Sequence, residues 1–220
     1  MNTVPESASF AARRSPPDMR KRRHLDALCI FCGTRSGHDS NLVEQAQDLG
    51  RAVASAGIRL IYGGGREGLM GAAAQSAAQS GGDVVAVVPE FMVDRLPMLA
   101  EPHRLIRVPD MHSRNATMYA LADAFVALPG GAGTVEELAE VVTWQRPEQH
   151  AKPMLIANFQ AHWSPLLAMY GQLERTGFMD LRLSQDVLIT DTPQAIIPAL
   201  QGAAYFGAGT GASRGPIDRQ

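Results

Sequence analysis

The sequence is poor in lysine, cysteine and aromatic residues, and it has no long apolar run. It contains two lysines, Lys21 and Lys152, two cysteines and 6% aromatic residues among 220 positions. No segment approaches the roughly 18 consecutive apolar residues of a membrane span, so none is predicted. No glycine precedes a Lys-Ser or Lys-Thr pair, which excludes a Walker A loop. The formal net charge of −2 gives no global basic field, so nucleic acid is not an expected partner.

The two cysteines, Cys29 and Cys32, are spaced as C-x-x-C within one apolar run. A thioredoxin-type pair begins a helix and a zinc knuckle needs a second pair, whereas this run is typical of a strand. A spacing of three in a strand places the side chains on opposite faces. We therefore interpret both cysteines as small buried hydrophobic residues. The six histidines follow no metal-binding pattern, so no metal site is predicted.

Both ends of the chain differ in composition from its middle. Residues 1–24 hold six basic and two acidic residues and lack the apolar segment of a secretory signal, which indicates a disordered basic tail and a cytoplasmic protein. An organelle address or an anionic docking segment stays open as an alternative. Residues 203–220, which are rich in glycine, are interpreted as a second disordered tail. Residues 25–202 are long enough for one domain with a full core.

Apolar strand-like runs alternate with helix-like segments throughout this domain. The predicted strands are 27–32, 58–62, 84–88, 105–108, 124–128, 154–157 and 187–190. The predicted helices are about 40–56, 68–80, 111–122, 135–146, 163–176 and 193–201. Such alternation predicts an α/β fold with a mostly parallel sheet covered by helices on both faces. Ligands bind such sheets beyond the carboxyl ends of the strands, where three glycine-rich turns fall.

The most informative of these turns is PGGAGTVEE, residues 129–137. It joins a predicted strand to a predicted helix, where glycines allow backbone N–H groups to converge on a ligand. A helix N-terminus favours an anion by roughly 0.3–1 kcal/mol, and by more when the site is partly buried. The turn therefore predicts a phosphate site. Two carboxylates beside it, Glu136 and Glu137, favour chemistry on a phosphorylated sugar or nucleotide.

Glu137 and Arg114 each have a structural as well as a functional interpretation. Thr134 and Glu137 match a capping box, in which the Thr134 side chain caps the helix N-terminus and the Glu137 carboxylate accepts from the backbone N–H of Thr134. The spacing leaves Glu137 open as a cap, as a catalytic group or as both. Arg114 lies at the start of a predicted helix, where a cation opposes the helix dipole. Its guanidinium is suited to a phosphate or to a carboxylate, although a surface arginine is the simpler explanation.

The second glycine turn formally matches the G-x-G-x-x-G fingerprint of dinucleotide-binding proteins. Its glycines are Gly63, Gly65 and Gly68, and Glu90 follows near the end of the next predicted strand. This turn is the second along the chain rather than the first, and no residues remain for a substrate domain. A dinucleotide site stays an alternative. Close packing of helix on sheet is the structural explanation for Gly68 and also for Gly71.

Three motifs in this order resemble the LOG family of cytokinin riboside 5'-monophosphate phosphoribohydrolases, long labelled lysine decarboxylases. They are YGGGREGLMG (62–71), MHSRN (111–115) and PGGAGTVEE (129–137), followed by HAKP (150–153). The resemblance covers roughly residues 26–201. It implies a Rossmann-like, doubly wound fold, a homodimer with a shared active site, and no cofactor. The implied reaction is hydrolysis of the N-glycosidic bond of cytokinin riboside monophosphates, and also of AMP, to free base and ribose 5-phosphate.

The resemblance also assigns roles to residues of this chain. Arg114 and Glu137 match the catalytic pair, and the arginine is expected to orient the carboxylate and keep it ionised. The implied substrate-binding residues are Gly130, Gly131, Gly133, Thr134, Glu136, Asn115, Met111, Gly64 and Thr143. Asn115 replaces a usual lysine, and Leu96 replaces a common glutamate, with Glu101 the nearest acid. Both departures bear on the base that is bound.

Two other functions remain to be weighed. A nucleotide carrier or sensor with the same fold and no turnover stays an alternative to the hydrolase. A decarboxylase that uses pyridoxal phosphate needs a lysine for its Schiff base. Lys21 lies in the basic tail and Lys152 directly precedes Pro153, so neither is expected in a glycine-rich crevice.

Overall fold

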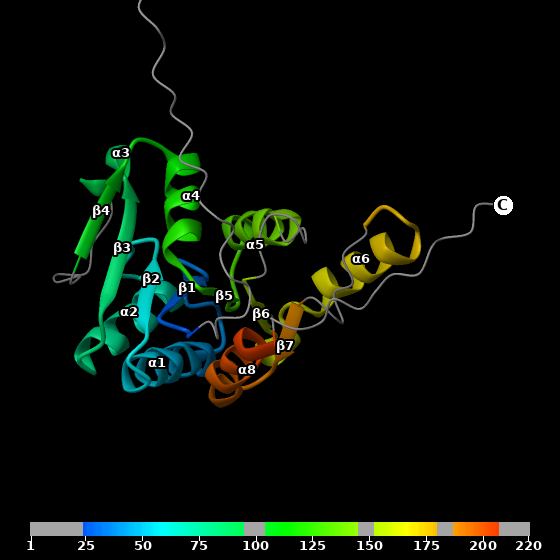
Figure 1. The fold of residues 1–220 in the computed structure, drawn as a ribbon, viewed down its shortest axis with the longest axis horizontal. Coiled ribbons are helices and arrows are strands. Elements are labelled where there is room, and N and C mark those ends of the chain that lie inside the picture. Colours follow the sequence, from blue (N-terminus) through cyan, green and yellow to red (C-terminus); the bar gives the residue numbers. More distant parts are fainter. Residues whose placement is uncertain (1–23, 95–103, 145–151, 180–186, 207–220) are drawn as a thin grey trace, which may run out of the picture.

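The computed structural model describes residues 24–94, 104–144, 152–179 and 187–206, and its centre is a seven-stranded sheet (Figure 1). The strands are β1 Ala27–Phe31, β2 Arg59–Tyr62, β3 Val84–Pro89, β4 Arg104–Val108, β5 Ala124–Ala127, β6 Met154–Ala157 and β7 Val187–Thr190. Their order is β4-β3-β2-β1-β5-β6-β7, and every pair is parallel. The strand order reverses between β1 and β5, as in doubly wound folds. The predicted α/β, doubly wound fold is confirmed.

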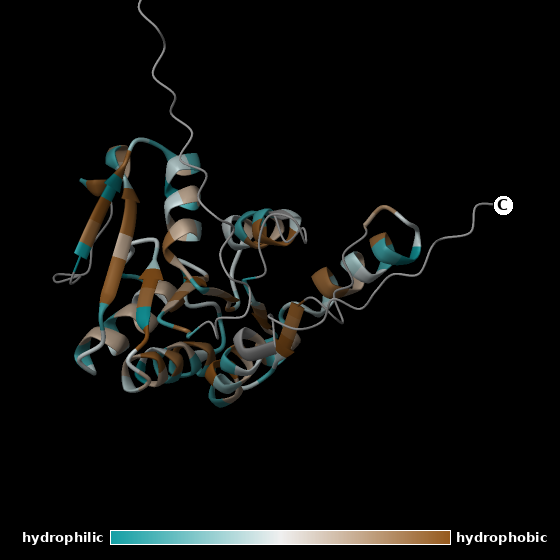
Figure 2. Ribbon diagram, viewed as in Figure 1, coloured by the Kyte–Doolittle hydropathy of each residue, from teal (hydrophilic) through white to brown (hydrophobic). Residues whose placement is uncertain are grey.

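Helices cover both faces of the sheet. They are α1 Ser40–Ser55, α2 Gly68–Gln79, α3 Glu90–Val93, α4 Met111–Leu121, α5 Ala132–Trp144, α6 Ser164–Arg175 and α8 Pro193–Phe206, with a 3₁₀ turn η1 at Phe159–Ala161. One core joins the sheet to α1, α2 and α8, and the other joins it to α4, α5 and α6. Figure 2 shows apolar strands between helices that carry hydrophilic residues.

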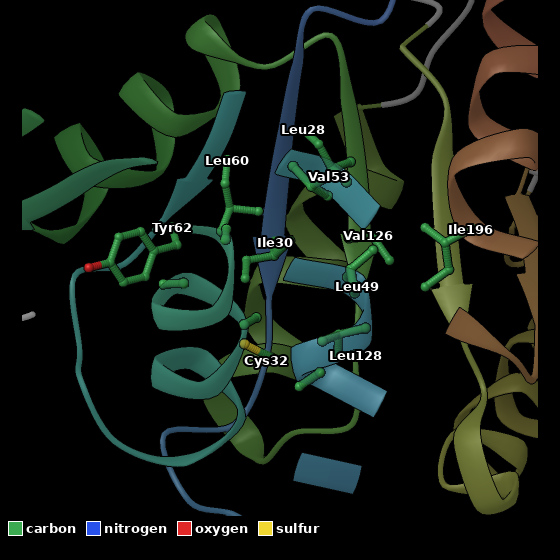
Figure 3. Packing of buried hydrophobic residues seen from close by; sticks show 14 of the residues in the cluster. Leu28, Ile30, Cys32, Leu49, Val53, Leu60, Tyr62, Val126, Leu128 and Ile196 are labelled. Atoms are coloured by element: carbon green, nitrogen blue, oxygen red, sulfur yellow. The ribbon is translucent and has the colours of Figure 1, made fainter. Parts of the chain in front are cut away.

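The strands are continuous apolar runs because both of their faces are buried. In β1 the side chains of Leu28 and Ile30, with Cys32 beyond, point toward α1 (Figure 3), while Cys29 joins the core on the opposite face. Both cysteines are buried and free, which confirms that they are small core residues. Burial raises the pKa of both thiols, so neither is a reactive thiolate. Each fully buried leucine or isoleucine contributes roughly 1.5–3 kcal/mol.

Two predicted element boundaries are wrong by several residues. Helix α5 begins at Ala132 rather than near residue 135. Helix α8 continues to Phe206, so the segment 203–206, predicted to belong to the C-terminal tail, is helical. Alanines and aromatic residues follow Gly202, and alanine propagates a helix better than any other residue. The remainder of both predicted tails, residues 1–23 and 207–220, lies outside the described residues.

Glycines permit the close approach of the turns at the carboxyl edge of the sheet. Gly68 has a φ of +63°, and a Cβ there would lie 2.3 Å from the carbonyl carbon of Thr34. A Cβ at Gly71 would lie 1.7 Å from the carbonyl oxygen of Arg66. Packing therefore explains these two glycines. Glu90, the acid required by the dinucleotide alternative, is exposed and pairs with Arg107 at 3.3 Å.

A glycine-to-alanine substitution in α1 should be destabilising despite the helix propensity of alanine. Propensity alone favours alanine by about 1 kcal/mol. A Cβ at Gly50, however, would lie 2.2 Å from the carbonyl oxygen of Ala73 in the packed helix α2. We expect Gly50→Ala to lower the free energy of unfolding by about 1–3 kcal/mol, as overpacking does.

Gly171 in α6 provides the matched control. A Cβ there would approach nothing closer than Nη1 of Arg175, at 3.4 Å. Gly171→Ala should therefore raise the free energy of unfolding by up to about 1 kcal/mol. Urea unfolding of both variants tests the prediction, and an unchanged or increased stability of Gly50→Ala would contradict it.

Candidate active site

The three glycine-rich turns meet beyond the carboxyl ends of β1 and β5. The N–H of Gly33 donates to the carbonyl of Pro129 at 3.0 Å, and the N–H of Met70 donates to the carbonyl of Gly33 at 3.1 Å. The turn after β1 thus contacts the turns after both neighbouring strands. This is the point where the strand order reverses, which is the usual ligand site of doubly wound sheets.

A buried ion pair lies at this edge of the sheet. Nη2 of Arg114, on α4, donates to Oε1 of Glu137, on α5, at 3.0 Å. Both side chains are about 90% buried. Asp110 fixes the start of α4 by accepting from the N–H of Ser113 at 2.7 Å, and this bond lowers the pKa of the Asp110 carboxyl. A charge-assisted bond in so dry an environment is held in one geometry.

Gly63, at the end of β2, makes room for the arginine. A Cβ at this position would lie 2.2 Å from Nη2 of Arg114, the same nitrogen that binds Glu137. The first glycine of the fingerprint is therefore required by the ion pair. The neighbouring Gly64, predicted to bind substrate, is buried in the same turn with a φ of +89°, a conformation that favours glycine.

The predicted capping box between Thr134 and Glu137 is wrong. Helix α5 begins at Ala132, and the N–H of Val135 donates to the carbonyl of Gly131. Thr134 is therefore inside the first turn rather than at the cap, and the Glu137 carboxylate is directed to Arg114 instead. The buried guanidinium is the stronger partner because an unpaired charge there would carry the full cost of desolvation.

The turn before α5 leaves open space over its glycines. Gly130 is needed by the fold, because a Cβ there would lie 2.1 Å from Oγ1 of Thr134. Gly131 and Gly133 are exposed and have ordinary φ values, and a Cβ at either would meet nothing within 4 Å. The protein itself does not require glycine at these two positions. The open space lies at the positive end of α5, which suits an anion.

A hollow of about 370 Å³ lies beside the ion pair. Its lining residues come from α4 and α5 and are Met111, His112, Asn115, Glu136 and Glu140. Nδ2 of Asn115 donates to Oε2 of Glu140 at 2.7 Å. Three of the predicted substrate residues, Met111, Asn115 and Glu136, are thus brought together. His112 and Glu140 were not predicted, although Glu140 follows Glu136 by one helical turn and so shares its face.

Other predicted site residues are less directly placed. Thr143 is exposed toward the end of α5, and its hydroxyl donates to the carbonyl of Glu140 at 2.8 Å. It does not line the hollow, and its role stays a prediction. Leu96 and Glu101 lie outside the described residues.

Burial dominates the electrostatics of Glu137. Desolvation raises the pKa of its carboxyl to about 7, while the charge of Arg114 opposes this shift and Glu136 and Glu140 add to it. Burial thus acts against ionisation of Glu137, whereas the charge and the hydrogen bond of Arg114 act in the expected direction, toward the ionised carboxylate. A carboxyl with a pKa near the working pH is suited to general base catalysis.

His162 is a residue of this edge that the sequence did not reveal. Its Nε2 lies 3.2 Å from the backbone nitrogen of Gly130 and 2.9 Å from the Gly130 carbonyl oxygen. It follows Gln160 and Ala161, whose φ values of +48° and +56° are left-handed. Such a conformation costs a non-glycine residue about 1–2 kcal/mol. No sequence pattern marks a single histidine 32 residues beyond the turn that it contacts.

The remaining candidates for chemistry are placed elsewhere. The ammonium of Lys152 donates to the carbonyl of Tyr119 at 2.6 Å and lies over its ring, away from the glycine turns. Within the described ranges, no three His, Cys, Asp or Glu side chains gather as a metal site would require. None of the helices described is long and apolar enough to cross a membrane.

Fold and site together define a Rossmann-like α/β protein with a buried arginine–glutamate pair beside an open glycine turn. A family model described as "possible lysine decarboxylase" matches residues 70–200. A cytokinin riboside 5'-monophosphate phosphoribohydrolase of Rhodococcoides fascians is 36% identical over 204 residues, which are 91% of this chain and 99% of that protein. A protein of the same name from Arabidopsis thaliana is 36% identical, covering 79% and 81%.

The chain belongs to the LOG family of phosphoribohydrolases, a family of hydrolases. Among solved structures it is similar to the molybdenum cofactor carrier protein of Chlamydomonas reinhardtii, with a TM-score of 0.64 and 18% identity over 82% of this chain and 98% of that one. A molybdenum cofactor binding protein of Rippkaea orientalis gives a TM-score of 0.61 and 19% identity, covering 81% and 97%. These likenesses concern the fold alone.

The titration of Glu137 can be measured directly. We expect its carboxyl ¹³C resonance to titrate with a midpoint near pH 7. Glu136→Gln should lower this midpoint, because the charge of Glu136 contributes to the shift. Glu44→Gln, an exposed change on α1, is the control and should leave it unchanged. A midpoint near the ordinary value of 4.5 would contradict the prediction.

The raised pKa of Glu137 also determines in which direction its ionisation changes the stability of the folded protein. Because the folded pKa lies above the ordinary value of 4.5, ionising Glu137 costs folding free energy. The stability linked to this carboxyl is fully present below pH 4.5 and is lost as the pH rises through about 7.

Proposed function

We propose that this protein hydrolyses the N-glycosidic bond of cytokinin riboside 5'-monophosphates and of AMP, releasing the free base and ribose 5-phosphate. The observation that carries the proposal is the buried Arg114–Glu137 pair beside the open glycine turn. The names of the relatives in Rhodococcoides fascians and Arabidopsis thaliana support the same reaction.

The phosphate would bind at the start of α5. Gly131 and Gly133 leave the first backbone N–H groups of the helix accessible, and Thr134 lies directly behind them. A phosphate held there supplies binding energy remote from the bond that breaks, and this energy positions the ribose. The hollow lined by Met111, Asn115 and Glu136 would then receive the base.

Glu137 would act on the anomeric carbon of the ribose. Cleavage of the bond from ribose to base builds positive charge on C1' and O4', as in other glycoside hydrolyses. The ionised carboxylate stabilises this charge and accepts a proton from the water that attacks C1'. The base leaves with the electron pair of the broken bond and takes up one proton, so that one water is consumed for each base released. Arg114 fixes the carboxylate by its bond of 3.0 Å and leaves the second oxygen of Glu137 for water.

A carrier or sensor without turnover is the second candidate. It stays a candidate because the same fold occurs in a molybdenum cofactor carrier protein, so the fold by itself does not imply turnover. Chromatography of products after incubation with AMP and isopentenyladenosine monophosphate separates the two. Free base and ribose 5-phosphate in equal amounts are expected of the hydrolase, whereas bound and unaltered nucleotide is expected of the carrier.

Glu137→Gln should reduce turnover by ~10²–10³ while nucleotide binding is largely kept. The amide keeps the size of the side chain and an oxygen for Arg114, but it has no negative charge and cannot accept the proton. The measurement is kcat for AMP beside the Kd of the nucleotide by calorimetry. A variant with near-normal kcat would show that Glu137 serves structure alone.

Gly133→Ala should separate phosphate binding from stability. The added methyl group would meet nothing in the protein, and alanine favours the helix by up to about 1 kcal/mol. We expect an unchanged or higher melting temperature together with a KM for AMP raised about tenfold or more. Gly202→Ala in α8, whose Cβ would also meet nothing within 4 Å, is the control and should leave KM unchanged.

A phosphate site at this turn predicts that nucleosides without a 5'-phosphate are hydrolysed less efficiently. Adenosine should show a much lower kcat/KM than AMP, and Gly133→Ala should narrow this difference. Equal values for the two substrates in the unaltered enzyme would contradict a phosphate site at this turn.

We also propose a cytoplasmic homodimer in which the partner lines part of the base site. Met111 is 40% exposed at the hollow, and α6 buries only Tyr170 while Met169 and Phe178 are exposed. Flexible and apolar exposed side chains suit a contact surface that a twofold axis uses twice. Light scattering should find a dimer at micromolar concentration. An active monomer would contradict the proposal.

A further inference from the structure

The imidazole of His162 contacts the first glycine of the turn at which we propose that phosphate binds. Its Nε2 lies within hydrogen-bonding distance of both the Gly130 N–H, at 3.2 Å, and the Gly130 carbonyl oxygen, at 2.9 Å. A Cβ at Gly130 would lie 2.1 Å from Oγ1 of Thr134, so the two residues are closely packed. Gly130 is therefore contacted by a side chain of α5 and by a side chain from the turn after β6.

The surroundings of His162 hold the ring in place. Trp163, which is only 3% exposed, packs its ring edgewise to the imidazole at a centroid distance of 4.7 Å. Oδ1 of Asn158 accepts from the N–H of Trp163 at 2.7 Å, and the N–H of Asn158 donates to Thr190 on the adjacent strand β7. The two left-handed residues, Gln160 and Ala161, complete the turn that directs His162 to Gly130.

Nε2 of His162 cannot bind both the N–H and the carbonyl oxygen of Gly130 in the same protonation state. An unprotonated Nε2 accepts from the Gly130 N–H, whereas a protonated Nε2 donates to the Gly130 carbonyl. A phosphate oxygen that bound the Gly130 N–H would compete with the first arrangement and would be compatible with the second. The contact to the carbonyl is the shorter of the two, and in the second arrangement the Gly130 N–H, which the structure directs at Nε2, would be free to bind a ligand instead.

We propose that His162 is a positioning residue for phosphate: with Nε2 protonated, it holds the Gly130 carbonyl and leaves the Gly130 N–H to the 5'-phosphate of the substrate. This inference rests on the proposed function, since it concerns the same turn. It assigns to His162 an effect on phosphate affinity rather than on the bond-breaking step, which belongs to Glu137 and Arg114.

A titration of the unaltered protein tests the proposal without any variant. Ribose 5-phosphate serves as the probe, and the ¹⁵N resonances of the imidazoles are followed. The Nε2 signal of His162 should move toward the position of a protonated nitrogen as the probe saturates. His24, which pairs with Asp26 at the amino end of β1, is the internal control and should not respond. An Nε2 signal that lies at the position of an unprotonated nitrogen at saturation would overturn the proposal.

Two substitutions test the same role by affinity. His162→Phe removes both hydrogen-bonding functions and should weaken binding of ribose 5-phosphate, and raise KM for AMP, about tenfold, with kcat within about twofold. His162→Gln offers an N–H donor and an oxygen acceptor and should recover most of the loss. His24→Gln is the control. An unchanged affinity in His162→Phe, or a loss confined to kcat, would overturn the proposal, and the ¹⁵N titration decides if that variant does not fold.

These measurements separate the inference from the proposed reaction. If the unaltered protein binds ribose 5-phosphate but releases no base from AMP, the proposed hydrolysis fails while the His162 titration still gives its answer. If base is released and ribose 5-phosphate binds, but neither the Nε2 signal nor the affinity of His162→Phe changes, the reaction stands and the role of His162 is refuted.

Discussion

The arrangement of the carboxyl edge depends on one interaction, the buried pair of Arg114 and Glu137. Removing two charges from water costs several kcal/mol for each ion, so such a pair contributes little net stability. Breaking it would nevertheless cost about 3–5 kcal/mol, because one buried charge would lose its partner. The pair therefore constrains its neighbours. Gly63 must lack a side chain, and α4 and α5 must face each other with these two residues aligned.

The charges around this pair are unevenly distributed. Glu136 and Glu140 lie near Glu137, and both raise the pKa of its carboxyl. Asn115 binds Glu140 without neutralising it. A surplus of negative charge beside a carboxyl whose pKa burial raises to about 7 favours any transition state that becomes more positive. The anion site that we propose at the start of the same helix needs the opposite sign, and the backbone N–H groups of α5 would supply it without a basic side chain.

Much of the fold could be predicted from the sequence, because the signals for strands and turns lie in short segments of the chain. All seven strands were predicted from short apolar runs, and the three glycine turns were placed on one edge by the rule for parallel sheets. The partnership of Arg114 with Glu137 was left open by spacing alone, since a capping box explained Glu137 equally well. The burial of both side chains in the folded protein determines that Glu137 pairs with Arg114. His162 and Glu140 escaped prediction for the same reason: each acquires its role from a residue that folding brings near.

Helix α5 links these parts in a fixed order. Gly133, Glu137 and Glu140 follow one another over seven residues, a rise of about 10 Å along the axis. A substrate whose phosphate binds the start of the helix would present its ribose near Glu137 and its base toward the hollow beside Glu140, the same order as in a nucleoside 5'-monophosphate. The helix thus sets the distance between anchor and reactive group. A change at the turn would weaken binding, and a change one turn later would slow the reaction, because a rigid element separates the two functions.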